Sequence, residues 1–170
     1  TAAEVADPAL GEVPGDAAVA LWRPGLEEEG GAPSVPSARV LLPVLPFGVA
    51  GAPAAVCFAE PLPQGFPPSE LVSPLLVAGA LRSLYDLRRI ERPAGLAEEL
   101  LAGVHGWRRR GIYLTPRCDP SGYGEVFRAF LESGVLLSPV FPGPSILPAG
   151  ELSRGEIRTM SGLLRRYPGE

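Results

Sequence analysis

The sequence contains no lysine: all fifteen of its basic residues are arginine. Lysine is the side chain that forms Schiff bases with carbonyl substrates and cofactors. Its absence excludes this covalent chemistry for the side chains of the chain itself.

Cysteine and histidine are also scarce, with two cysteines and one histidine among 170 residues. Two cysteines cannot form a disulfide framework or a cysteine-rich zinc site, and we expect Cys57 to be a small buried apolar side chain. The run of acidic residues at Glu27–Glu29 is more typical of a solvated face than of a cation site. We therefore predict neither a metal site nor a bound cofactor.

Charge is low overall and unevenly distributed. The net charge of −4 gives no general attraction to nucleic acid, which we do not expect as a partner. Nine acidic residues and two arginines precede Leu81, whereas ten acidic residues and thirteen arginines occur from Leu81 onward. The two halves therefore present different surfaces to a partner.

The run VLLPVLPFGVAGAPAAVCFA, Val40 to Ala59, has no charged residue and is long enough for a membrane-spanning helix. Pro43, Pro46 and Pro53 would each break such a helix, and hydrocarbon cannot satisfy the freed backbone groups. We predict no membrane span but two short buried strands, at residues 40–45 and 54–58. No signal peptide is visible, so we expect a cytoplasmic protein.

Residues 1–37 are rich in alanine, proline, glycine and acidic residues, which is typical of a loosely ordered segment. Residues 38–170 have the length of one ordinary domain. Their pattern predicts an α+β fold: a small mixed or antiparallel sheet with helices on one face, preceded by a long helix and by the two buried strands.

Two helices have clear start signals. Ser73 and Pro74 are a favourable N-cap and first helical residue, and apolar residues recur at helical spacing up to residues 88–89. Ser153 and Glu156 form a capping box that predicts a final helix. Between these helices we predict a helix at residues 96–104, a strand at 111–114, a helix ending at Gly134, and strands at 135–137 and 145–147.

The region from Arg39 to Arg166 resembles the C-terminal part of class III, fold-type-I aminotransferases, which use pyridoxal phosphate. SELVSPLLVAGALRSLYDL has the outline of the turn and long helix that join the two domains of that family, with Ser69 in place of a threonine. VFRAFLESGVLLSP is similar to the family's helix and Gly-Val strand, and SILPAGELSRGEIRTM to its final strand and helix. The resemblance implies dimers whose active sites are shared between subunits.

Two departures from the family pattern imply that the catalyst is missing. The Schiff-base lysine should lie in a loop upstream of the long helix, where this sequence has LPFGVAGAP. The arginine that commonly holds a substrate carboxylate corresponds to Ser145, which cannot make a bidentate carboxylate pair. We expect that the chain is not an enzyme.

The candidate ligand-binding residues are Ser69, Trp107, Arg108, Arg109 and Arg110. An indole beside three arginines can grip phosphate or stack on a base, and Ser69 can retain a phosphate contact from the family pattern. The structural interpretation, which we favour, is a solvated turn with Trp107 packed against the domain and a capping or loop role for Ser69.

The segment SPVFPGPSILP is a candidate interaction surface. Its prolines hold the apolar residues Val140, Phe141, Ile146 and Leu147 in a semi-rigid stretch suited to docking against another chain. Covering the domain's own core explains these residues equally well.

Three functions are compatible with these features. The leading hypothesis is a non-catalytic, aminotransferase-like interaction or assembly module that pairs with itself or with a partner protein. The alternative is a small-molecule or phosphate-binding protein that uses the Trp107–Arg110 patch. A hydrolase built on His105 ranks last, because no Gly-x-Ser-x-Gly motif accompanies it.

Overall fold

The computed structural model describes residues 5–27, 35–44, 55–62, 64–65, 71–89, 95–147 and 152–167. The chain divides into two compact units: unit 1 is Thr1–Leu26 with Pro33–Arg89, and unit 2 is Glu27–Ala32 with Ile90–Glu170. This division differs from the predicted one, which has a single boundary at residue 37.

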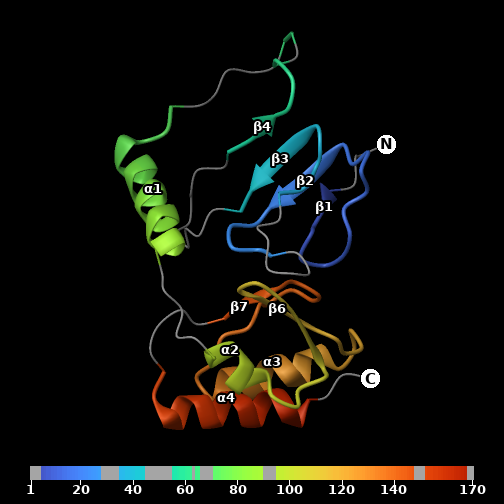
Figure 1. Cartoon of the computed structure of the whole chain (residues 1–170), viewed down its shortest axis with the longest axis vertical. Coiled ribbons are helices and arrows are strands. Elements are labelled where there is room, and N and C mark those ends of the chain that lie inside the picture. Colours follow the sequence, from blue (N-terminus) through green and yellow to red (C-terminus); the bar gives the residue numbers. More distant parts are fainter. Residues whose placement is uncertain are drawn as a thin grey trace. The chain divides into compact units, whose positions relative to one another are not determined.

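Unit 1 contains a four-stranded mixed sheet with the order β1-β2-β3-β4 (Figure 1). Its strands are β1 (Val5–Ala6), β2 (Val19–Trp22), β3 (Val40–Pro43) and β4 (Cys57–Phe58). β2 pairs in parallel with β1 and β3, whereas β3 and β4 are antiparallel. Strands β3 and β4 lie within the two strands predicted in the long uncharged run, but they are shorter, and they are not buried as predicted: β3 is half-buried and β4 is exposed or half-buried. Residues 45–54 between them lie outside the described ones.

β1 and β2 lie within the segment whose composition predicts loose order. An ion pair accompanies them: Arg23 donates from Nε and Nη2 to the two carboxylate oxygens of Asp7, at 2.8 and 2.6 Å. Both side chains are nearly buried, with 13% and 12% exposed. Bidentate, largely desolvated pairs of this kind impose a definite geometry. Composition does not reveal such order, because the two partners are sixteen residues apart.

Cys57 is exposed, so the prediction that it is buried is wrong. It lies in β4, the last strand in the order of the sheet. An edge strand has a neighbour on one side only, and its side chains are covered less completely. The apolar character of the surrounding run therefore does not decide the burial of this thiol.

Helix α1 (Pro74–Arg89) confirms the helix predicted from Ser73 and Pro74. The N–H of Val77 donates to the carbonyl oxygen of Ser73 at 3.1 Å, which closes the first turn. Ala80 is buried, whereas Leu75 and Leu81 are exposed. In the part of the chain that the structure describes, no helix is long and apolar enough to cross a membrane.

Unit 2 contains a three-stranded antiparallel sheet with helices on one side (Figure 1). Its strands are β5 (Trp107–Arg110), β6 (Tyr113–Pro116) and β7 (Ser145–Ile146), and its helices are α2 (Leu96–Leu101), α3 (Tyr123–Glu132) and α4 (Arg154–Arg166). Side chains from the sheet and from all three helices share one core, which includes Leu100, Trp107, Leu114, Phe130, Met160 and Leu164. The predicted α+β class is confirmed.

Two local predictions in unit 2 are wrong. Residues 107–110 form strand β5 and not a turn, because their backbone pairs with β6 across a two-residue turn at Gly111 (φ 59°). Residues 135–137 are not a strand. The N–H of Val135 donates to the carbonyl oxygen of Phe130 at the end of α3. The N–H of Ser138 donates to the Ser145 side chain and not to the backbone of a strand.

The start of α4 is the capping box that the sequence predicts. The Glu156 N–H donates to Ser153 Oγ at 3.3 Å, and the Ser153 N–H donates to Glu156 Oε2 at 2.7 Å. Hydrogen bonds from the side chain and backbone of Ser153 hold the pKa of Glu156 below its usual value. Two backbone N–H groups at the end of the helix are thus satisfied by these two residues.

Replacing Ser153 with alanine removes the cap and should lower the free energy of unfolding by about 1 kcal/mol, whereas Ser153→Thr should lower it less.

Stability should also depend on pH, because the folded state depresses the pKa of Glu156. The carboxylate of Glu156 therefore stabilises the folded state above the unfolded pKa of 4.5, and this stabilisation is lost as the pH falls through the folded pKa. Urea denaturation between pH 3 and pH 7 measures both effects. Glu156→Gln should flatten the profile, and an unchanged profile in that variant would contradict this assignment.

Candidate functional site

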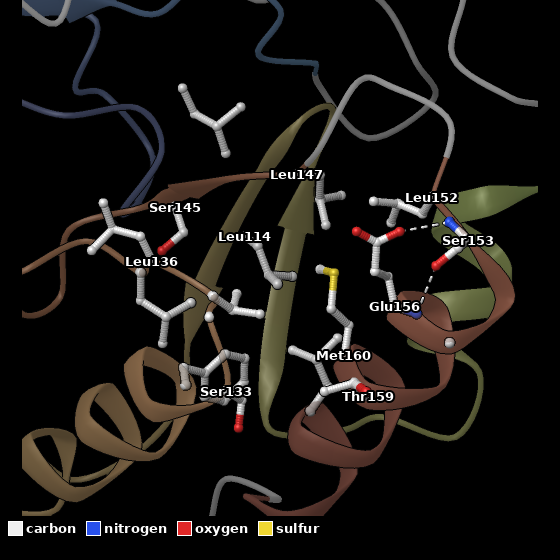
Figure 2. Close-up of a pocket in the computed structure, with 17 residues that line it drawn as sticks. Leu114, Ser133, Leu136, Ser145, Leu147, Leu152, Ser153, Glu156, Thr159 and Met160 are labelled. Carbon is white, nitrogen blue, oxygen red and sulfur yellow. Dashed lines mark hydrogen bonds between the residues drawn. The ribbon is translucent and has the colours of Figure 1, made fainter.

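A cavity of about 610 Å³ lies in unit 2 between the end of α3, the sheet and the start of α4 (Figure 2). Most of its lining is apolar, with contributions from Leu114, Phe130, Leu137, Leu147, Met160 and Leu164. Its volume falls in the range of small-molecule sites, about 300–1,000 Å³. The cavity is therefore large enough for a ligand of moderate size.

Hydroxyl groups are spaced around this apolar surface, from Ser133, Ser145, Ser153 and Thr159. Ser145 is buried, and its Oγ accepts a hydrogen bond from the N–H of Ser138 at 2.9 Å. A hydroxyl that accepts one bond still has a proton to donate. The hydroxyl of Ser133 is engaged elsewhere, because it donates to the carbonyl oxygen of Ala129 at 2.9 Å.

Glu156 supplies the charge of the cavity. One carboxylate oxygen is held by the Ser153 N–H, and Figure 2 shows the other turned towards the interior of the cavity. Since its pKa lies below the usual value, the carboxylate is ionised at neutral pH. No arginine is among the described residues that line the cavity.

The reactive side chains of unit 2 lie apart from this cavity. His105 is exposed and does not line it, and no described serine or cysteine is hydrogen-bonded to it. Burial raises the pKa of Cys118, so its thiol stays protonated at neutral pH. The described residues contain no cluster of histidine, cysteine or carboxylate side chains that could hold a metal ion. The chemistry that the cavity offers is hydrogen bonding, apolar contact and one negative charge.

The predicted ligand-binding patch lies on β5, outside the cavity. Trp107 is buried, with its ring centroid 5.6 Å from that of Phe130. Arg109 makes an ion pair with Glu98 at 3.2 Å and also donates to the carbonyl oxygen of Gly111. Arg110 donates to the carbonyl oxygen of Glu27 at 3.4 Å. None of these arginines lines the cavity described above, and Ser69 lies outside the described residues.

The predicted interaction segment separates into exposed and buried members. Val140 and Ile146 are exposed, whereas Leu147 belongs to the core. Phe141 is partly buried, with its ring 5.3 Å from that of Tyr123. Ser145, the position at which the family resemblance implies an arginine, lies in the cavity wall.

Several cavity residues were not identified from the sequence. Leu136 follows α3, whereas Thr159 and Met160 are neighbours in α4, and Glu156 has a sequence signal only as a helix cap. The periodicity of α4 does place Met160 on an apolar stripe, but periodicity cannot distinguish a core residue from one that also borders a cavity.

No family model matches the chain, and no curated protein or solved structure matches it either. The resemblance to class III aminotransferases therefore stays a prediction based on sequence motifs. Function has to be argued from the residues of the structure itself.

One buried polar atom in unit 2 has no partner among the described residues: the indole N–H of Trp107. An unsatisfied buried donor costs about 1–3 kcal/mol. Trp107→Phe removes this penalty and also loses ring volume, so we expect the free energy of unfolding to change by less than about 1 kcal/mol. Trp107→Ala should cost about 3–5 kcal/mol.

Chemical denaturation of both variants measures the difference. If Trp107→Phe lowers the free energy of unfolding as much as Trp107→Ala does, the indole N–H has a hydrogen-bond partner and the assignment of an unsatisfied donor is incorrect. Phe130→Leu, which alters the neighbouring ring without touching a polar group, is the packing control.

Proposed function

We propose that this chain is a non-catalytic interaction or assembly module with an aminotransferase-like fold, and that it associates with a second copy or with a partner protein. The observation that carries this proposal is a group of exposed apolar side chains beside the cavity of unit 2. We call Leu136, Val140 and Ile146 the apolar rim.

The three side chains of the apolar rim expose 73%, 68% and 57% of their surfaces. Leu136 and Ile146 also line the cavity. Val140 is connected to the cavity wall through Ser138, whose hydroxyl donates to the Val140 carbonyl and whose N–H donates to Ser145. Exposed apolar side chains that border an apolar cavity, as Leu136 and Ile146 do, favour a protein contact over a solvated surface.

The backbone that presents Val140 is closely packed. The N–H of Gly143 donates to the carbonyl oxygen of Val140 at 2.6 Å. A Cβ at Gly143 would lie 2.5 Å from that oxygen and from Ser138 Oγ, so only glycine fits. A turn held in one conformation loses little entropy on binding, which favours its use as a contact surface.

Two features support a non-catalytic role. The chain has no lysine for a Schiff base, and serine occupies position 145, where the resemblance implies an arginine. The alternative, a ligand site built on Trp107–Arg110, gains no support, because Trp107 is in the core and the arginines do not line the cavity.

Native mass spectrometry of the protein isolated from its own host tests the proposal first. We expect a homo-oligomer or a stoichiometric second protein. In Val140→Asp/Ile146→Asp the dissociation constant should rise at least about tenfold, because two carboxylates would have to be buried in the contact. The unfolding free energy should stay within about 0.5 kcal/mol, since both side chains are exposed.

The matched control is Leu75→Asp/Leu81→Asp, which places the same two charges on exposed leucines of α1 in unit 1. This control should associate like the parent. A protein that is monomeric and without a stoichiometric partner would overturn the proposal. Association that is lost in the control and kept in Val140→Asp/Ile146→Asp would assign the contact to α1 and overturn the role of the apolar rim.

A further inference from the structure

We infer that the cavity of unit 2 binds a small molecule with an apolar body and an uncharged or cationic polar end, such as an arylalkyl alcohol or amine. This inference rests on three features of the cavity lining: an apolar floor, a buried hydroxyl and a single carboxylate. The cavity shares Leu136 and Ile146 with the apolar rim, but ligand binding and the proposed assembly are tested by separate measurements, the first by the Met160 signal and the second by mass.

The ligand needs an apolar body because buried apolar residues form the floor of the cavity. Leu114 from β6, Phe130 from α3 and Met160 from α4 are all buried core residues that also face the cavity. A cavity of about 610 Å³ with this lining favours an aliphatic or aromatic group over a polar one, because polar groups lose their hydration there without replacement partners. Methionine adapts to the shape of such a group.

Either of two groups, on opposite parts of the wall, can bind the polar end of the ligand (Figure 2). Ser145 is a buried hydroxyl whose oxygen is held by the Ser138 N–H and whose proton is left for an acceptor. Glu156 has one oxygen held by Ser153 and the other directed into the cavity, where it can accept a hydrogen bond from an alcohol or an ammonium group. Both groups are positioned by bonds within the protein.

The charged residues around the cavity determine which charge a ligand can carry. Glu156 is the one charged side chain among the seventeen described residues around the cavity. The positive end of the α4 dipole could attract an anion, but Glu156 lies in its first turn and already compensates it. Glu156 is exposed, so its charge is partly screened by solvent. A carboxylate or phosphate ligand would nevertheless meet a like charge, with no arginine among the described residues of the cavity lining, whereas an ammonium ligand would meet an opposite charge.

The chain offers a direct reporter for occupation of the cavity. Met160 is the one methionine in the sequence, and it lies in the cavity floor. Labelling with ¹³C-methyl methionine therefore gives a single methionine methyl signal in the full 170-residue chain. The probes are 4-phenylbutylamine, 4-phenylbutanol and 4-phenylbutyrate, which share one apolar body and differ in charge.

We expect the amine and the alcohol to shift the Met160 signal saturably, and the amine to bind about tenfold more tightly than the butyrate. Glu156→Gln should weaken amine binding about three- to fivefold and leave alcohol binding unchanged. Glutamine can keep the capping bond to the Ser153 N–H, so this variant removes the charge and not the helix start. Thr159→Arg should reverse the preference in favour of the butyrate.

Two controls match these variants in chemistry and lie outside the cavity. Glu125→Gln removes an exposed carboxylate from α3, and Gly124→Arg adds an arginine to the same helix at a position with open space. Neither should alter the order of the three affinities.

Three outcomes would overturn the inference. The first is that none of the probes shifts the Met160 signal up to its solubility limit. The second is that the butyrate binds as tightly as the amine. The third is that Thr159→Arg leaves the order of the three affinities unchanged, which would place the bound probe outside the cavity.

Discussion

Unit 2 depends on where α4 begins, and the capping box of Ser153 and Glu156 decides that point. Starting the helix there turns Met160 and Leu164 towards the core, while Glu156 and Thr159 reach the cavity. Met160 and Leu164 are four residues apart and therefore lie on the same face of the helix. The same carboxylate that caps the helix thus supplies the negative charge of the candidate site.

The segment between α3 and α4 contributes both to the core and to the surface. Leu137 and Leu147 are buried, and Leu136 and Ile146 beside them are exposed. The Ser138–Ser145 hydrogen bond joins the two arms of this segment. This arrangement leaves apolar side chains at the edge of the cavity, so the candidate ligand site and the proposed contact surface adjoin each other.

The arginines of the chain are used for structure wherever their contacts are described. Arg23 pairs with Asp7 in unit 1, and in unit 2 Arg109 pairs with Glu98 and Arg165 donates to the carbonyl oxygen of Ala102. Guanidinium groups suit this use, since each offers several donors in a fixed planar arrangement. In consequence the cluster at residues 108–110, the most conspicuous basic feature of the sequence, lies on a strand and does not border the cavity.

The sequence by itself determined the features that depend on neighbouring residues: the starts of α1 and α4, the end of α3 at Gly134 (φ 79°) and the α+β class. Caps and helical periodicity act over three or four residues, so they can be read directly from the order of amino acids. Tertiary structure decided the pairing of β5 with β6, the order of residues 5–27, the exposure of Cys57 and the assembly of the cavity. Each of these depends on contacts between distant segments, such as Asp7 with Arg23 or Ser145 with Glu156 around one cavity, and no local pattern of side chains specifies which segments meet.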